Sequence, residues 1–281
     1  MHKRRQRPSL LHLATLSGLL LLSACSFTTR DSGPSRAMDF SHVPDAIPKQ
    51  EKRTRAGNPS TYVVLGKRYY VMASSKGYTE RGIASWYGNK FHGRKTSNGE
   101  IYNMYAMTAA HKTLPIPSYL QVTNLKNGKQ VIVRVNDRGP FHENRIIDLS
   151  YAAASKLGIV ATGTGMVELR ALEPGESATP VTRVAQSNEA DDSLPVPAPA
   201  EAGKNQLFLQ LGSFISRDNA ESLRARLTLN NVSDATVLAS TVDRQNIYRV
   251  RIGPLSSVEE ADRLAIQIDR LGIGVPTIVI D

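Results

Sequence analysis

Gly82-Ile83-Ala84-Ser85-Trp86-Tyr87-Gly88 opens a block of short apolar runs that extends to Leu172 and decides the fold. The runs are rich in Val and Ile and are separated by Gly, Asn and Pro, which predicts strands at 82–87, 105–110, 119–124, 130–136, 145–148 and 165–171. Asn127-Gly128 between two of them predicts a hairpin. Ser150 is placed to cap one short helix that Gly158 ends. Six short strands and one helix predict a small closed barrel.

Three ionisable side chains lie at turns or strand ends in this block. Glu100 follows the turn Asn98-Gly99, and Asp137 ends an apolar strand. His111 directly follows the predicted strand 105–110. Strand ends converge at the mouth of a barrel, so we expect the three to meet in one groove. Two carboxylates can cleave a glycosidic bond if burial or a like charge keeps one protonated. Two alternatives stay open: a structural ion pair of Asp137 with Arg138, and Glu100 as a solvated turn residue.

Four motifs in the block resemble the rare lipoprotein A family, and the likeness extends to the flanking regions. They are Gly-Ile-Ala-Ser-Trp-Tyr-Gly, Thr-Ser-Asn-Gly-Glu, Thr-Ala-Ala-His-Lys-Thr-Leu-Pro and Val-Arg-Val-Asn-Asp-Arg-Gly-Pro-Phe, which begin at 82, 96, 108 and 133. The resemblance implies a multidomain chain with a mainly β, six-stranded double-psi β-barrel over 81–172. It also implies an endolytic lytic transglycosylase, which cleaves denuded peptidoglycan between N-acetylmuramic acid and N-acetylglucosamine and leaves 1,6-anhydro ends.

The resemblance also implies roles for single residues. Asp137 would protonate the glycosidic oxygen and then, as a base, take the proton of the C6 hydroxyl as that oxygen closes on C1. Glu100 is implied as an essential carboxylate, and His111 as a polar partner or substrate contact. No cofactor is expected, and no metal, because no His or carboxylate pair has ligand spacing on a defined element. The candidate substrate contacts are Trp86 (equally a core residue), Tyr87, Asn98 and Arg138.

The composition of residues 1–24 predicts a lipoprotein signal peptide. Four basic residues precede the apolar run 10–22, which is too short to span a bilayer comfortably. Leu22-Ser23-Ala24 before Cys25, the single cysteine, resembles the lipobox of bacterial lipoproteins. The resemblance implies cleavage before Cys25, its lipid modification and a membrane anchor, and Ser26 by analogy favours the outer membrane, facing the periplasm. An ordinary signal peptide with an incidental cysteine is the alternative.

The segments that flank the barrel differ in composition. Residues 25–60 are rich in Ser, Thr, Arg, Lys and Pro without hydrophobic periodicity, which predicts a disordered tether. Two apolar runs separated by Gly66-Lys67 predict a hairpin within 61–80, an N-terminal extension of the barrel. Residues 173–203 are acidic and hold five prolines, which predicts an extended linker.

The positive charge is concentrated in the barrel. Residues 81–172 carry twelve Lys and Arg against five Asp and Glu, a net charge of +7 out of +10 for the chain. A basic surface of this kind indicates an anionic polymer, either nucleic acid or an acidic glycan. The chain has no RNP, helix-turn-helix or zinc-finger pattern and carries an export leader, so we expect glycan and no nucleic acid.

Residues 204–281 contain a twofold βαβ pattern. Strands are predicted at 207–214, 236–241, 248–255 and 276–280, with helices at 217–229 and 257–271, the second capped by Ser256-x-x-Glu259. This βαββαβ order predicts a small α+β domain, an antiparallel sheet with both helices on one face. Alternation predicts that Phe208, Gln210 and Gly212 share a face. An RNA-binding sheet is disfavoured because the domain is electrically neutral.

The same residues resemble the SPOR domain, through Gly-Ser-Phe after the first strand and Tyr-Arg-Val-Arg-Ile-Gly-Pro in the third. That family binds denuded septal glycan, which implies enrichment at the division septum and leaves divisome proteins as further partners. The implied contacts are Gln210, Ser213, Arg249 and Arg251. The alternative function is a non-catalytic wall-binding lipoprotein, either expansin-like or an adaptor.

Overall fold

The computed structural model describes residues 31–36, 38–177 and 205–281. The predicted signal peptide, Cys25 and most of the predicted linker 173–203 lie outside these ranges. None of the helices among the described residues combines the length and apolar character needed to cross a membrane.

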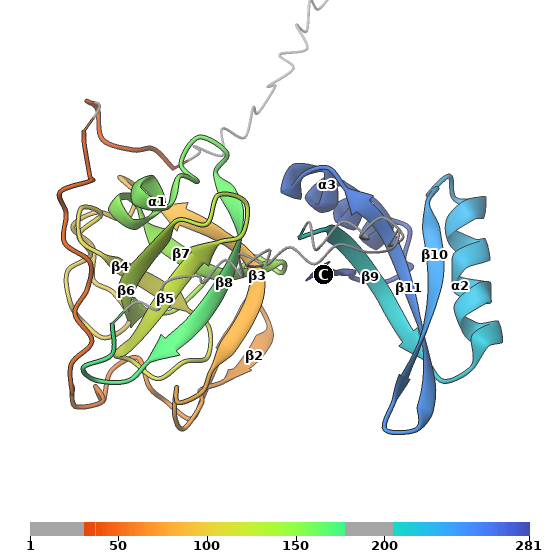
Figure 1. Ribbon diagram of the computed structural model, residues 1–281, viewed down its shortest axis with the longest axis horizontal. Coiled ribbons are helices and arrows are strands. Elements are labelled where there is room, and N and C mark those ends of the chain that lie inside the picture. Colours follow the sequence, from red (N-terminus) through yellow and green to blue (C-terminus); the bar gives the residue numbers. More distant parts are fainter. Residues whose placement is uncertain (1–30, 37, 178–204) are drawn as a thin grey trace, which may run out of the picture. The chain divides into compact units, whose positions relative to one another are not determined.

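Six strands close into a barrel, as predicted (Figure 1). Around the barrel their order is β3-β7-β4-β6-β5-β8. The strands are β3 (Thr79–Tyr87), β4 (Thr108–His111), β5 (Ser118–Asn124), β6 (Gln130–Asp137), β7 (Arg145–Ser150) and β8 (Thr164–Leu172). The pair β3 and β7 and the pair β4 and β6 are parallel, and the other neighbours are antiparallel.

The parallel pairing of β4 with β6 positions the residues of interest. Ala110 of β4 pairs with Asp137 of β6, so the two strands end side by side. The loops that follow these strands therefore leave the barrel at the same edge. This brings His111 and Asp137 close in the fold although 25 other residues separate them in the chain.

Alternate side chains of the strands fill the barrel. On β6, Val131, Val133 and Val135 are buried in the core, whereas Arg134 is only partly buried. Beside the barrel lies α1 (Tyr151–Leu157), whose caps are those predicted. The Ser150 side chain accepts a hydrogen bond from the Ala153 amide, and Gly158 ends the helix in the left-handed conformation, at φ 78°.

Residues 38–58, which we call the strap, run in extended form along the outside of the barrel (Figure 1). The prediction of a disordered tether over 25–60 is wrong for this part. Phe40 is 3% exposed and its ring lies against those of Tyr105 and Tyr151. The Ala46 amide donates to the Ile132 carbonyl at 3.0 Å. The anchors are irregularly spaced and form no helix or strand, which is why no periodicity revealed them.

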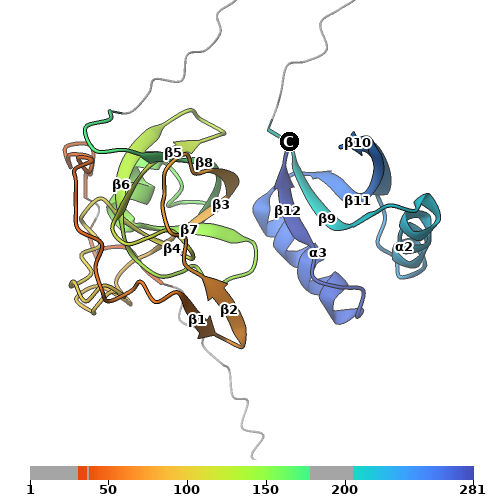
Figure 2. The same cartoon turned by 90° about the horizontal axis from the view of Figure 1, so that it is seen from below.

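The hairpin predicted after the strap is present as β1 (Thr61–Val64) and β2 (Lys67–Tyr70) (Figure 2). The Tyr62 hydroxyl donates to the Lys112 carbonyl at 2.7 Å. Lys67 forms an ion pair of 2.7 Å with Glu143. These two contacts join the hairpin to the loops that follow β4 and β6.

The C-terminal domain has the predicted βαββαβ order. Its elements are β9 (Leu207–Phe214), α2 (Arg217–Leu229), β10 (Ala235–Val242), β11 (Gln245–Leu255), α3 (Val258–Arg270) and β12 (Thr277–Ile280). The antiparallel sheet has the order β10-β11-β9-β12. Residues of both helices, such as Leu227 and Ile268, are buried with Leu209 and Val250 of the sheet, so both helices cover one face (Figure 2).

Two local predictions in this domain are wrong. The N-cap of α3 is Ser257, whose side chain accepts from the Glu260 amide, one residue later than predicted. Glu260 in return accepts from the Ser256 amide at 2.8 Å. A register shift in β9 pairs Gly212 with Val250, on the helix-covered face. Gly212 therefore does not share a face with Gln210, because a bulge breaks the alternation.

Candidate active site

The tight turn from Thr96 to Glu100 holds Asp137 in place. The turn is closed by a bond of 2.8 Å from the Thr96 amide to the Glu100 carbonyl, with Gly99 at φ 91°. Asp137 Oδ1 accepts from the Ser97 amide at 2.8 Å and from the Ser97 hydroxyl at 2.5 Å. It also accepts from the Arg138 amide at 2.7 Å. Asp137 is thus bound to backbone and hydroxyl donors, not to the guanidinium of Arg138.

Glu100 ends the same turn, and its side chain is 42% exposed. Its Oε2 accepts from Arg134 Nη1 and from Asn136 Nδ2, both at 2.9 Å. Partial burial alone would raise the pKa of Glu100, but the hydrogen bonds from Arg134 and Asn136 outweigh it and lower the pKa below its ordinary value. Glu100 is therefore a carboxylate near neutral pH, not a solvated turn residue without partners.

The structure brings Glu100 and Asp137 to the same turn. Glu100 belongs to the turn itself, and Asp137 is bonded to Ser97 in that turn. Asn136, next to Asp137 in the chain, donates to Glu100. A single turn and the end of β6 therefore hold both groups.

His111 lies next to this site but is enclosed. Its side chain is buried, with the residue 3% exposed. Nδ1 accepts from the amides of Thr113 and Leu114 at 3.2 and 3.0 Å, so Nε2 carries the ring hydrogen toward the Tyr78 hydroxyl at 3.0 Å. Burial first, and then the charge of Arg138, lowers the pKa of His111 to about 3. The ring is neutral, and it shapes the loop after β4 without reaching solvent.

Arg138 joins three segments. Its guanidinium donates to the carbonyl oxygens of Gly57, Leu114 and His111 at 2.8, 2.6 and 3.1 Å. A fourth bond of 3.1 Å goes to Asn58 Oδ1. Arg138 therefore holds the strap and the loop after β4 in place. Its guanidinium nitrogens are used in these bonds and are not free to bind a substrate.

The two aromatic candidates belong mainly to the core. Trp86 is partly buried, with its ring edge-on to Tyr151 at 5.2 Å. Tyr87 is 7% exposed and stacks on Tyr102 with 4.0 Å between ring centres. Burial also raises the pKa of the Tyr87 hydroxyl well above its usual range. Tyr87 therefore presents no open face on which a sugar could stack, and Trp86 is partly covered.

In the part of the chain that the structure describes, the side chain of Asn98 makes hydrogen bonds through its oxygen only. Its Oδ1 accepts from the Thr96 hydroxyl at 2.6 Å and from the Glu100 amide at 3.2 Å. Its Nδ2, like Oδ1 of Asn136, is buried with no hydrogen-bond partner among the described residues. Both unpaired atoms belong to residues that bind Glu100.

Sequence reasoning missed three members of this arrangement. Ser97 lies inside a recognised motif, and its place two residues before Gly99 was a usable signal. Arg134 also lies inside a recognised motif, and its partners are Glu51 and Glu100. Glu51 comes from the strap, where nothing in the sequence pattern marks it.

The four residues proposed for the C-terminal domain lie together. Register pairs Arg251 with Gln210 and Arg249 with Ser213. Arg251 Nε donates to Gln210 Oε1 at 3.1 Å, and Gln210 Nε2 donates to the Ser213 hydroxyl at 3.3 Å. Arg251 also forms an ion pair with Asp281, and Arg249 bonds to Ser240. Adjacent strands alone bring this polar cluster together.

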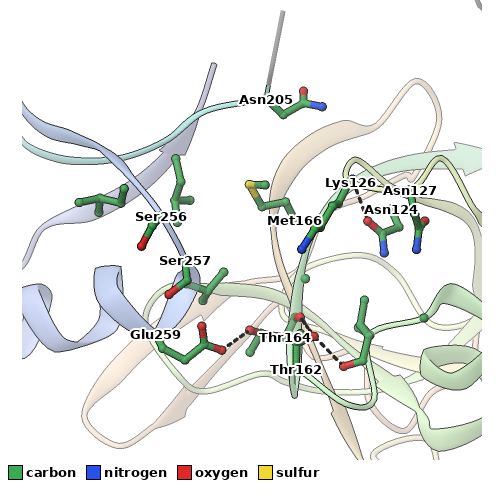
Figure 3. A pocket seen from close by; sticks show the side chains of 16 residues that line it. Asn124, Lys126, Asn127, Thr162, Thr164, Met166, Asn205, Ser256, Ser257 and Glu259 are labelled. Atoms are coloured by element: carbon green, nitrogen blue, oxygen red, sulfur yellow. Dashed lines mark hydrogen bonds between the residues drawn. The ribbon is translucent and has the colours of Figure 1, made fainter.

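Other polar groups complete turns. In the turn after β5, Asn124 Oδ1 accepts from the Lys126 amide at 2.9 Å (Figure 3). The Thr162 hydroxyl donates to the carbonyl oxygens of Ile159 and Thr164 at 3.1 and 2.6 Å (Figure 3). Among residues 31–36, 38–177 and 205–281, no three His, Cys, Asp or Glu side chains are grouped so that they could hold a metal ion.

Comparison with known proteins identifies the family. The family described as "Lytic transglycolase" matches residues 79–169, and the SPOR domain family matches residues 203–280. The endolytic peptidoglycan transglycosylase RlpA of Pseudomonas aeruginosa is 42% identical over 291 aligned positions, which cover 89% of this chain and 84% of that protein. The chain belongs to the RlpA family.

Other RlpA proteins are similarly close. The endolytic peptidoglycan transglycosylase RlpA of Neisseria meningitidis serogroup B is 47% identical over 218 positions, covering 77% of this chain and 82% of that protein. A crystal structure of the SPOR domain of RlpA from Pseudomonas aeruginosa is 34% identical, with a TM-score of 0.25, and covers 26% of this chain and 96% of that one. The two family matches and the RlpA relatives confirm the expected family and its two domain types.

Proposed function

We propose that this RlpA protein is an endolytic peptidoglycan transglycosylase that cleaves denuded glycan strands between N-acetylmuramic acid and N-acetylglucosamine. The names of its relatives and the match to a lytic transglycosylase family support the reaction type. The observation that carries the proposal is the arrangement of Asp137. All three of its hydrogen bonds go to Oδ1, and Oδ2 receives none from the described part of the chain.

Asp137 acts as acid and then as base. Oδ2 gives its proton to the glycosidic oxygen, so the leaving sugar departs as an alcohol. The resulting carboxylate then removes the proton of the C6 hydroxyl as O6 bonds to C1. The reaction consumes no water, and the product carries a 1,6-anhydro ring. The bonds from Ser97 and Arg138 hold Oδ1, which aims Oδ2 in both steps.

Glu100 stabilises the positive charge that develops on the sugar ring. Arg134 and Asn136 keep it ionised, and its 42% exposure leaves it open to the substrate. Asn98, whose Oδ1 accepts from the Glu100 amide, contacts the glycan beside Glu100. His111 and Arg138 act as positioning residues, because their polar atoms are committed to the backbone around the site. Trp86 and Tyr87 pack against Tyr151 and Tyr102.

The C-terminal domain binds denuded glycan through Gln210, Ser213, Arg249 and Arg251, and concentrates the protein at the division septum. Its match to the SPOR family and the clustering of these four residues support this role. A lipid on Cys25 anchors the chain in the outer membrane, and divisome proteins are further partners. Two glycan-binding domains on one chain raise the local substrate concentration to the order of millimolar.

The test is digestion of naked glycan strands in water enriched in ¹⁸O. We expect fragments with 1,6-anhydro ends that carry no ¹⁸O, because no water enters the reaction. Fragments with ¹⁸O at the new end would show hydrolysis instead. If the chain sediments with the glycan but releases no fragment, it is a wall-binding protein.

A further inference from the structure

Glu51 of the strap reaches the guanidinium that holds Glu100. Arg134 donates from Nε to Glu51 Oε1 at 2.7 Å and from Nη2 to Glu51 Oε2 at 2.9 Å. Its remaining nitrogen, Nη1, donates to Glu100 Oε2 at 2.9 Å. One arginine therefore joins a carboxylate of the strap to a carboxylate of the candidate active site.

The paired contact fixes the plane of the guanidinium. Two parallel bonds between arginine and a carboxylate hold the group in one orientation, which a single bond does not do. The pair is sheltered, with side-chain exposures of 19% for Arg134 and 23% for Glu51. The Tyr119 hydroxyl also donates to Glu51. Nη1 is thereby directed at Glu100.

We propose that Glu51 is a positioning residue for the cleavage reaction and that the strap is part of the active site. Glu51 orients Arg134, and Arg134 holds the Glu100 carboxylate where it meets the substrate. This inference rests on the proposed role of Glu100. The strap also packs on the turn itself, because a Cβ on Gly57 would lie 3.1 Å from the backbone of Ser97.

The strap offers its own control. Lys156 of α1 forms an ion pair of 2.5 Å with Asp45, which docks the strap at a place that has no bond to Glu100 or Asp137. Lys156→Gln therefore weakens docking of the strap without touching Arg134. A general effect of strap docking would appear in both variants, and an effect through Arg134 would appear only with Glu51→Gln.

The first test measures turnover of naked glycan by the full chain. Since Glu51→Gln loosens a charge-assisted hydrogen bond to Glu100, we expect kcat to fall about tenfold with KM within about twofold. Lys156→Gln keeps the wild-type kcat. In an Arg134→Ala background, Glu51→Gln causes no further loss, because both changes remove the same interaction. Equal losses in the Glu51 and Lys156 variants, or additive losses with Arg134→Ala, would overturn the proposal.

The second test needs no turnover and so separates this inference from the proposed function. The Glu100 carboxyl is titrated by NMR with ¹³C-labelled Glu, in wild type and Glu51→Gln. The groups that face it are Arg134 and Asn136 of β6 and Asn98 of its own turn. Loss of the Arg134 bond raises the pKa of Glu100, whereas mere removal of the Glu51 charge lowers it. We expect a rise; a fall or no change would refute the positioning role.

Discussion

The candidate active site and the polar cluster of the C-terminal domain are assembled in different ways. In the barrel, Asp137 is held by Ser97 in a loop, and Arg134 by Glu51 in the strap, 40 and 83 positions away in the chain. Neither contact follows from the pairing of strands. The barrel site therefore depends on irregular segments whose packing must be complete.

In the C-terminal domain, Arg251 meets Gln210 because β11 and β9 are paired at those positions. The same register places Arg249 opposite Ser213. The barrel site should therefore respond to changes far from the carboxylates, whereas the C-terminal cluster should respond only to changes within it.

The largest effect on stability is expected for the anchor of the strap. Phe40→Ala removes a ring that is 3% exposed, and should lower the free energy of unfolding of the barrel by about 3–5 kcal/mol. Denaturant unfolding measures this. Met38→Ala, at a side chain that is 52% exposed, should change stability by less than about 0.5 kcal/mol. Equal stability of the two variants would mean that the strap is a loose tether after all.

The next largest effect is expected when the charge of Glu100 is removed. Glu100→Gln keeps an acceptor for Arg134 but loses the charge that stabilises the sugar cation, so the rate on naked glycan should fall about 10- to 100-fold. The same change at Glu143, whose half-exposed side chain pairs with Lys67, should leave the rate unchanged. A Glu100→Gln rate close to that of wild type would remove this residue from the mechanism.

His111 should make the barrel sensitive to acid. Its pKa is about 3 in the folded chain against 6.5 for an ordinary histidine, so the unfolded state binds more protons between these values. Stability therefore falls as the pH drops through this window, by at most about 1.4 kcal/mol per pH unit. His111→Gln should flatten the dependence measured by urea unfolding at about pH 6.5 and 5. His42→Gln, at a side chain that is 91% exposed, should not.

The smallest effect is expected in the C-terminal cluster. Arg251→Ala removes a charged donor and should weaken glycan binding about tenfold in a sedimentation assay, with stability of the barrel unchanged. Arg226→Ala, an exposed arginine on α2, is the control and should bind as wild type. A loss of barrel stability with Arg251→Ala would contradict the modular behaviour of this domain.

The sequence was sufficient where regular structure decides the outcome. Apolar runs located all six barrel strands, and Ser150 and Gly158 marked the ends of α1. These features depend on local propensity and on side-chain alternation. We also expected Glu100 and Asp137 to lie close together, but the bond from Ser97 that holds Asp137 at the turn is a tertiary contact.

The remaining features depend on contacts that leave no periodic signal. The strap has no helix or strand, so Phe40 and Glu51 looked like residues of a tether. The bulge that turns Gly212 to the helix-covered face of its sheet adds one residue that alternation does not predict. The burial of Tyr87 and the commitment of Arg138 to backbone carbonyls are likewise results of tertiary packing.

In the proposed mechanism, Asp137 moves the proton in both halves of the cleavage. The most direct measurement compares the release of 1,6-anhydro fragments from naked glycan by wild type and by Asp137→Asn, using mass spectrometry. Asparagine can still accept the bonds from Ser97 and Arg138, so the turn should survive while the proton is lost. We predict anhydro products from wild type and a rate about 10²- to 10⁴-fold lower from the variant. Equal release of anhydro fragments by the two proteins would rule out the role of Asp137 as acid and base.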